Sequence, residues 1–451
     1  MQKILAVVLV LLATHQSWGQ AKKIAFTEYD LDNGLHVILH KDNTTPIVAV
    51  TVLYNVGSKN EDPKRTGFAH FFEHLLFEGS ENIGRGQIDR YIRNAGGTLN
   101  AYTTQDRTFY HEVLPSNQLA LGLWIESERM LHAKIDTIGV ETQREVVKEE
   151  KRQRIDNQPY MSFQYELFSR AFKVHPYRWI TIGSLEHLSE ATLAEFIDFY
   201  HTFYVPQNAT LSIAGDIDIA STRKLVDQYF KDIPKGSKPV PRPTVVEPPQ
   251  KEEIRDVVFD NIQLPAVFQG YHIPADGTDE AYALDMLNRL LSGGQSSRMY
   301  RSLVDEQKKA LVVQAFPYPL TDPGLYIVLA LPNVGVDIED LEKAMDAEID
   351  KVKNELISES EFQKIRNQVE SQFVQQNSSV AGIAEQLAIY HVNFGEADLI
   401  NTEIEKYMKV TREDLQKVAR KYLTRENRVV LHYLPKSAQE KPGTTKVEQS
   451  K

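Results

Sequence analysis

The sequence predicts an α+β protein of two duplicated domains, each built from a mostly antiparallel sheet covered by helices. Three observations lead to this prediction. Hairpin and strand signals alternate with long helical patterns, which is typical of the α+β class. A proline-rich segment near the middle divides the chain into two parts of similar length. Helix–strand units of the first part recur about 220 residues later, as expected of an internal duplication.

Length and composition agree with a multidomain globular protein. The chain has 451 residues, too many for one ordinary domain. Its formal net charge of −11 argues against a broad nucleic-acid-binding surface, so we expect no nucleic-acid partner. It contains no cysteine, which excludes disulfides, thiolate catalysis, iron–sulfur clusters and cysteine-liganded zinc.

Residues 1–19 have the pattern of a secretory signal peptide. Lys3 supplies the positive charge, Ile4 to Ala13 form an apolar run, and the small residues Ser17 and Gly19 precede the predicted cleavage site. The alternative is an N-terminal membrane anchor, but the run is shorter than the roughly 20 residues that span a bilayer. No later segment is long and apolar enough, so we expect an exported, periplasmic protein with no transmembrane span after cleavage.

Residues 20–232 form the first predicted domain. It opens with a hairpin, because Asn33 and Gly34 supply the positive φ of a tight turn. Alternation of apolar residues predicts strands, and helical periodicity predicts helices. The predicted strands are 36–40, 47–54, further strands near 98–114 and one from 208, and the predicted helices are 65–78, 85–95, 116–131, 138–155 and one from 188.

A linker and a second domain follow. The predicted linker, residues 233–250, is rich in proline, which favours extended backbone and excludes helix. Residues 251–436 form the second predicted domain, in which Ser358 and Glu361 make a capping box that opens a helix. The polar residues 437–451 are expected to be a disordered tail.

The duplication rests on matched units in the two parts. A helical pattern from Leu188 is followed by a strand pattern, and so is the helical pattern from Thr411. The segment around His74 aligns in the same way with the segment around Arg289. We therefore expect the two domains to share one fold.

One apolar helical segment, residues 67–78, carries polar groups on a single side. His70 and His74 are one turn apart and share a face, with Glu73 beside them. Buried imidazoles and a buried carboxylate need a partner. Zinc is such a partner, since two neutral imidazoles and one carboxylate leave its fourth position for water. The order His-x-x-Glu-His inverts the His-Glu-x-x-His order of most zinc proteases, and a carboxylate at hydrogen-bonding distance can take the proton of the bound water.

A second pair of histidines with the same spacing serves as a control. His36 and His40 lie in a predicted strand, where residues four apart are about 13 Å from one another. We interpret them as ordinary sheet residues.

The spacing of residues in the sequence does not identify the third zinc ligand. The predicted helix 138–155 contains Glu145, Glu149 and Glu150, and most of these must belong to a solvated acidic face. Nothing in their spacing selects one of them.

From Leu31 to Pro435 the chain resembles the pitrilysin/insulinase family of zinc metallopeptidases, in the half-length branch that includes the mitochondrial processing peptidase. The resemblance rests on three segments: 67–77, 96–103 and 143–150. It implies that Glu150 is the third ligand of one zinc ion per chain, beside His70 and His74, and that Glu73 is the base. It also implies two similar α+β domains that form half of a clamshell.

The resemblance also assigns supporting residues. The family usually has a glutamate where this chain has Gln143, which can orient a ligand but cannot take a proton. Asn100, Ala101 and Thr103 match the edge strand on which family members bind the substrate backbone by strand addition. An ordinary internal strand is the alternative for this segment.

Two residues of the family's active site are replaced. Val304 and Leu311 stand where active members have an arginine and a tyrosine, and neither can donate a hydrogen bond to an oxyanion. A homologous partner chain is expected to supply this pair, and Arg298 with Tyr300 is a second possibility within this chain.

The sequence thus predicts a zinc endopeptidase that acts on peptides or unfolded segments. A non-catalytic scaffold subunit of the same family is the main alternative. Phosphate binding through residues 84–86 is a weaker alternative, because the glycine pattern is incomplete.

Overall fold

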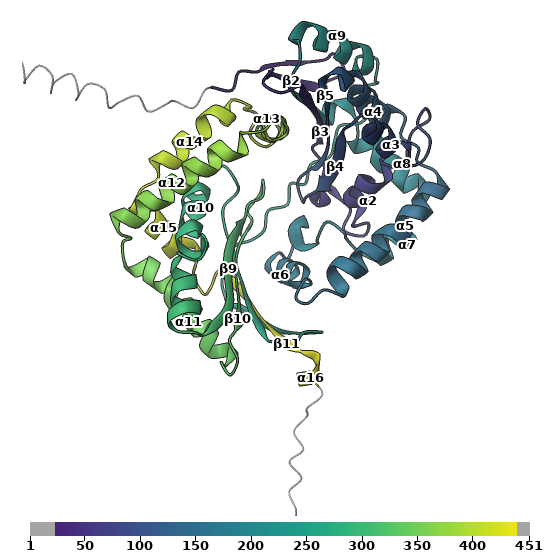
Figure 1. Ribbon diagram of the computed structural model, residues 1–451. Coiled ribbons are helices and arrows are strands. Elements are labelled where there is room, and N and C mark those ends of the chain that lie inside the picture. Colours follow the sequence, from purple (N-terminus) through teal and green to yellow (C-terminus); the bar gives the residue numbers. More distant parts are fainter. Residues whose placement is uncertain (1–22, 440–451) are drawn as a thin grey trace, which may run out of the picture.

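The computed structural model describes residues 23–439 (Figure 1). The predicted signal peptide, residues 1–19, lies outside the described residues, as do residues 440–451. The start of the expected tail is ordered, because Lys436–Gln439 form a short helix, α16. This corrects the expectation that disorder begins at residue 437.

Two sheets organise the described chain. The first has six strands in the order β1-β2-β6-β3-β5-β4, and the second has five in the order β7-β11-β8-β10-β9. The first sheet consists of β1 (Thr27–Asp30), β2 (His36–Lys41), β3 (Ile47–Tyr54), β4 (Thr98–Thr103), β5 (Thr108–Pro115) and β6 (Ala209–Gly215). The second consists of β7 (Ile254–Asp260), β8 (Ala266–His272), β9 (Ala310–Tyr318), β10 (Leu325–Pro332) and β11 (Arg428–Pro435).

The two sheets repeat one topology. Apart from β1, the order β2-β6-β3-β5-β4 corresponds strand by strand to β7-β11-β8-β10-β9. In each sheet one pair is parallel, β2 with β6 and β7 with β11, and the other pairs are antiparallel. The predicted fold class, two duplicated domains with mostly antiparallel sheets, is confirmed.

The helices predicted at 65–78, 85–95, 116–131 and 138–155 are present with ends shifted by up to four residues, and the first part also contains helices at 163–171 and 219–230 that were not predicted. The helices of this part are α2 (Phe68–Leu75), α3 (Gln87–Asn94), α4 (Leu119–Leu131), α5 (Thr137–Lys151), α6 (Phe163–Ala171), α7 (Leu185–Glu190), α8 (Leu193–Phe203) and α9 (Ile219–Phe230). After α5 the chain continues through one π-helical segment, Arg152–Asp156. The helix predicted from residue 188 is in fact two helices, because Thr192 and Glu195 form a capping box that starts α8.

The helices of the second part are longer. They are α10 (Asp279–Ser292), α11 (Ile338–Asn354), α12 (Glu359–Gln376), α13 (Val380–Phe394), α14 (Leu399–Lys409) and α15 (Arg412–Tyr422). The predicted capping box of Ser358 and Glu361 is present at the start of α12. Thr411 caps α15, as its pattern indicates.

Each half contributes one helix to the sheet of the other half. α13 of the second half packs on β2, β3 and β6 of the first sheet, where Leu387 contacts a cluster that contains Ile38 and Ala49. α6 of the first half packs on β8 and β11 of the second sheet, with Leu167 in the same cluster as Phe268. The halves are therefore joined by two apolar interfaces as well as by the linker (Figure 1).

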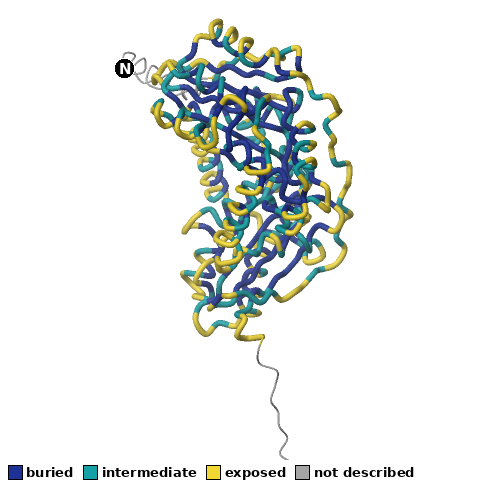
Figure 2. The backbone as a smooth tube through the Cα atoms, turned by 90° about the vertical axis from the view of Figure 1, so that its right-hand side faces the viewer, coloured by how far each residue is buried: buried dark blue, intermediate teal, exposed yellow. Residues whose placement is uncertain are grey.

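The chain as a whole forms a crescent, and buried backbone fills both of its halves (Figure 2). Residues 234–253, which include most of the predicted linker, contain no helix or strand. The linker nevertheless contacts the first half, since Glu247 accepts hydrogen bonds from the backbone of Lys173, Val174 and His175. Among residues 23–439 no helix is both long and apolar enough to cross a bilayer.

Candidate metal centre

Helix α2 carries both histidines and is held at its N-terminus by a buried carboxylate. Gly67 precedes the helix with φ of 100°, a conformation that glycine adopts without strain. Glu61 is buried and accepts hydrogen bonds from Gly67 N at 2.9 Å and from Ala69 N at 2.8 Å. No motif in the sequence indicated Glu61.

The other end of α2 is held by buried donors. Arg129 of α4 donates to Leu76 O at 3.3 Å, and Tyr110 of β5 donates to Phe72 O at 2.9 Å. Arg129 is itself fully buried beside the carboxylates of Glu126 and Glu112. Both ends of the histidine-bearing helix are thus fixed by polar contacts to its neighbours.

Three side chains converge between α2 and α5. Glu150 Oε2 lies 3.0 Å from His74 Nε2 and 3.5 Å from His70 Nε2. The two imidazole rings are 4.9 Å apart and inclined by 69°. One ligand atom of each residue lies within 4.8 Å of the others. The structure therefore brings together the three residues that the sequence and the resemblance singled out as ligands.

The donor set fits a zinc ion. Glu150 Oε2 and His70 Nδ1 are buried, and no hydrogen-bond partner is present for either atom. Burial, with a further effect of neighbouring His74, lowers the pKa of His70 to about 4, which favours the neutral, metal-binding imidazole. Two neutral imidazoles and one carboxylate are the donors that zinc takes with a fourth position left open.

Glu73 lies on the same helix and is linked to strand β4. Thr103 Oγ1 donates a hydrogen bond to Glu73 Oε2 at 2.6 Å. Burial raises the pKa of Glu73, and the Thr103 hydrogen bond opposes this effect. The carboxylate is thereby held between the paired histidines and the end of β4.

β4 is an edge strand. It pairs with β5 on one side, and no strand of the described chain pairs with its other side. Asn100 is exposed, Ala101 is buried, and Thr103 makes the contact with Glu73. An edge of this kind offers backbone groups to an extended peptide.

Gln143 lies in α5, two turns before Glu150, but it contacts neither histidine. Its side chain donates to Glu78, which is also paired with Arg85. A nearer partner of Glu150 is Arg154, whose Nη1 lies 2.6 Å from Glu150 Oε1. Glu150 and Arg154 are four residues apart on a helix, so their ion pair could have been predicted from the sequence.

The second half places the replaced residues on η6, a π-helical segment (Tyr300–Glu306), and β9. Val304 lies in η6, and Leu311 is the second residue of β9 (Ala310–Tyr318), with 43% of its surface exposed. Arg298 is bound to Glu361 by two hydrogen bonds of 2.9 Å. This ion pair holds the pKa of Glu361 at about 2.

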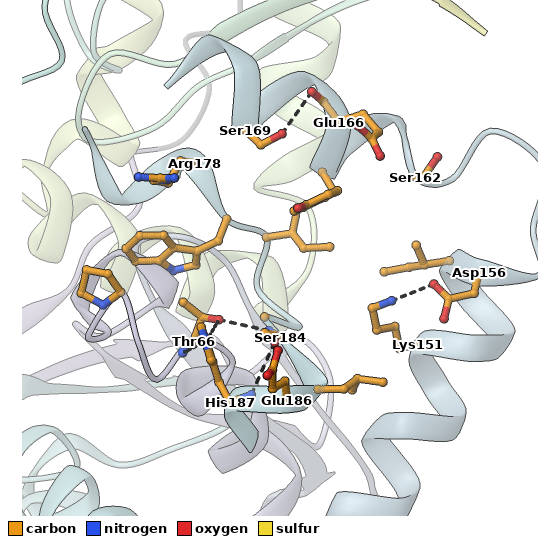
Figure 3. Close-up of a pocket in the computed structure, with 17 residues that line it drawn as sticks. Thr66, Lys151, Asp156, Ser162, Glu166, Ser169, Arg178, Ser184, Glu186 and His187 are labelled. Carbon is orange, nitrogen blue, oxygen red and sulfur yellow. Dashed lines mark hydrogen bonds and ion pairs between the residues drawn. The ribbon is translucent and has the colours of Figure 1, made fainter. Parts of the chain in front are cut away.

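A cavity in the first half is lined by other residues than the paired histidines, and Figure 3 shows its lining. It encloses about 750 Å³ and is lined by residues such as Lys151, Trp179 and His187. His70, Glu73, His74 and Glu150 do not line it.

Family models and related proteins agree with this geometry. Residues 36–184 match the family "Insulinase (Peptidase family M16)", and residues 190–369 match "Peptidase M16 inactive domain". The chain is 33% identical over 399 residues to "Zinc protease PqqE" of Helicobacter pylori, with 87% of this chain and 89% of that protein covered. It is 26% identical over 410 residues to an uncharacterized zinc protease of Mycobacterium bovis, covering 88% and 90%.

Solved structures show the same fold. A crystal structure of a protease from Helicobacter pylori superposes with a TM-score of 0.87 at 29% identity, covering 91% of this chain and all of that one. The periplasmic protease PqqL from Escherichia coli gives a TM-score of 0.75 at 18% identity, covering 94% of this chain and 49% of that one. This chain thus spans about half the length of PqqL, and it belongs to the insulinase family of peptidases, family M16, as a half-length member.

Proposed function

We propose that the chain is a zinc-dependent endopeptidase that hydrolyses peptides or unfolded polypeptide segments. The observation that carries this proposal is the convergence of His70 Nε2, His74 Nε2 and Glu150 Oε2 beside the carboxylate of Glu73. The relatives named as zinc proteases support the same assignment.

The residues divide the chemistry between them. His70, His74 and Glu150 hold one zinc ion, which when bound supplies the Lewis acidity that polarises a peptide carbonyl and activates water. Glu73 takes the proton of the attacking water and passes it to the leaving amine. Thr103 orients Glu73 through its hydrogen bond of 2.6 Å.

The substrate lies along β4 in this proposal. The free edge of β4 pairs with an extended peptide through backbone hydrogen bonds, and Asn100, Ala101 and Thr103 are the contacting residues. Because Thr103 also touches Glu73, a peptide paired with β4 passes next to the base. Recognition of this type selects extended, unfolded segments more strongly than particular side chains.

A second subunit completes the active site. Val304 and Leu311 cannot stabilise an oxyanion, and Arg298 is already engaged by Glu361. This chain also spans about half the length of PqqL. A homologous partner chain that carries the arginine and the tyrosine therefore supplies the missing donors, each of which is worth roughly 100- to 1,000-fold in rate.

Glu73→Gln tests the peptidase assignment. It should lower cleavage of an unfolded protein by roughly 100- to 10,000-fold while the bound zinc stays at one ion per chain. Glu145→Gln is the matched control, since Glu145 lies on α5 with its side chain 75% exposed and should leave activity unchanged. The assay uses the chain co-purified with its partner, and equal activity of Glu73→Gln and wild type would reject the proposal.

The absence of the arginine and tyrosine at positions 304 and 311 also favours an alternative, a non-catalytic scaffold subunit of the same family. The two functions differ in what Glu73→Gln does in cells. A scaffold is unaffected by this substitution, whereas a peptidase loses its biological effect.

The proposed location is the periplasm. The pattern of residues 1–19 supports export, and the fold neighbour PqqL is described as periplasmic. Fractionation of cells that express the full chain tests this proposal: the processed protein should be released with the periplasmic fraction, and retention in the cytosol would contradict it.

A further inference from the structure

A second group of metal-ligating side chains lies where the two halves meet. Among the described residues, two groups of three such side chains bring their ligand atoms within 4.8 Å of one another. One is the centre described above. The other consists of Glu28 on β1, His36 at the start of β2 and His391 on α13. His36 and His391 come from opposite halves of the chain.

One ring nitrogen of His36 is held by a carboxylate and the other is free to bind a metal ion. Its Nδ1 lies 2.7 Å from Asp30 Oδ1, and its side chain is only 13% exposed. Its Nε2 is buried, has no hydrogen-bond partner, and lies 3.4 Å from Glu28 Oε2. A carboxylate that fixes one ring nitrogen and leaves the other for the ion is the usual arrangement around histidine ligands.

His391 supplies the second imidazole. Its ring stacks on that of His36 with centroids 3.5 Å apart and planes inclined by 3°. In the described chain neither ring nitrogen of His391 makes a hydrogen bond, so no polar contact holds the half-buried ring in this orientation. One ion cannot lie in the planes of two parallel rings, so binding requires His391 to turn about its Cβ–Cγ bond.

His40, on the same strand as His36, does not belong to the cluster. Its Nδ1 bonds to Ala25 O at 2.7 Å. His36 and His40 do not bind an ion as a pair, but His36 is more than the ordinary sheet residue that its spacing indicated, because Glu28 of β1 and His391 of α13 accompany it.

We propose that Glu28, His36 and His391 form a second zinc site, distinct from the peptidase centre, that ties α13 of the second half to the edge of the first sheet. Two imidazoles and one carboxylate are the same donor set as in the first centre. Glu28 is 44% exposed, which leaves water access to the remaining position.

The site has a structural consequence. α13 also contacts the substrate edge strand, since Tyr102 OH on β4 donates to Glu385 Oε1 at 2.8 Å. An ion at His391 thus stiffens a helix that spans the first sheet from β2 to β4. Its role is to hold the two halves in one relative position.

Zinc counting on metal-free protein tests the proposal. After dialysis against micromolar zinc, elemental analysis should find two ions per wild-type chain and one per His391→Ala chain. The variant His70→Ala/His74→Ala should retain one ion and lose it when His391→Ala is added. Since this variant lacks the peptidase centre, the result is independent of the proposed function.

His201→Ala is the matched control, because this exposed histidine lies outside both groups and should not change the count. Circular dichroism checks that each variant is folded. The proposal is overturned if wild type and His391→Ala bind equal amounts of zinc. It is equally overturned if the folded His70→Ala/His74→Ala variant binds none.

Discussion

At the scale of single residues, the polar partners of α5 explain why a glutamine replaces the family's usual glutamate. Gln143 donates to Glu78, a buried residue just beyond α2, and Arg85 bridges Glu78 to Asp136. A carboxylate at position 143 would face Glu78 with no proton to donate. The amide therefore matches its environment, and the supporting role expected of Gln143 is exerted on Glu78 rather than on a ligand.

Gln143→Glu should destabilise the protein by about 1–3 kcal/mol, because it places a half-buried carboxylate against the buried carboxylate of Glu78. Adding Glu78→Gln should recover most of this loss, since the hydrogen bond is restored with donor and acceptor exchanged. Urea unfolding of the wild type, both single variants and the double variant measures the coupling. Strictly additive effects would show that the two side chains do not interact.

At the scale of elements, α2 is positioned by buried polar side chains at both ends. Glu61 holds its first turn, and Arg129 holds its last. The pKa of Glu61 is raised to about 8 by burial, although the backbone donors of Gly67 and Ala69 oppose this. The geometry of the histidine pair thus depends on residues far from it in the sequence.

Arg129→Met should cost about 3–5 kcal/mol, because Glu112 and Glu126 are left buried without their cation. Arg93→Met is the control, since Arg93 forms an exposed i,i+4 pair with Asp89 and should have no measurable effect. Unfolding free energies from urea titrations compare the two variants. A stability of Arg129→Met equal to that of Arg93→Met would contradict this role of the buried cluster.

A second charged cluster connects elements of the second half. Glu342 of α11 accepts hydrogen bonds from Arg255 of β7 at 2.6 and 2.7 Å and lies 2.7 Å from His432 Nε2 of β11. Burial alone would raise the pKa of Glu342, but the hydrogen bonds of His432 and Arg255 outweigh it and hold this pKa at about 2. The cluster therefore favours the ionised carboxylate in the folded state.

The stability that Glu342 contributes should be present above pH 5 and lost as the pH falls from 5 to 2. The unfolded carboxyl, with a pKa near 4.5, takes up its proton first, so acid favours unfolding. Glu342→Gln should be less stable at pH 7, and its difference from wild type should shrink as the pH falls. Urea unfolding at several pH values measures the unfolding free energies of wild type and Glu342→Gln. A difference between the two proteins that stays the same from pH 7 to pH 2 would disprove the prediction.

At the scale of the whole molecule, the two halves complete each other. α13 covers the first sheet and α6 covers the second, so each apolar face is buried by the other half. The corresponding positions of α6 and α13 in the repeated topology make this an exchange between equivalent elements. The linker is thus not what holds the crescent together.

A chain cleaved at a protease site inserted after Ser237 should still elute as one particle in gel filtration. The interface clusters around Leu387 and Leu167 hold the halves together after the linker is cut. Leu387→Asp places a charge at a fully buried position of this interface and should release the cleaved halves. Separation of the cleaved wild-type halves would show that the linker is required.

The sequence by itself determined the features that depend on local spacing. Residues four apart on an apolar helix must share a face, so His70, Glu73 and His74 were identifiable without coordinates. The hairpin at Gly34, the capping box of Ser358, the helix that begins after Thr411 and the duplicated topology follow from turn chemistry, capping and periodicity in the same way.

Only the tertiary structure decided which distant groups meet. Packing of α5 on α2 turns Glu150 toward the histidines, while Glu145 and Glu149 point outward to Lys148 and Arg152. The exchange of α6 and α13, and the partnership of His36 with His391, join residues hundreds of positions apart. Such contacts arise from the burial of whole faces between halves, and no local pattern in the chain encodes them.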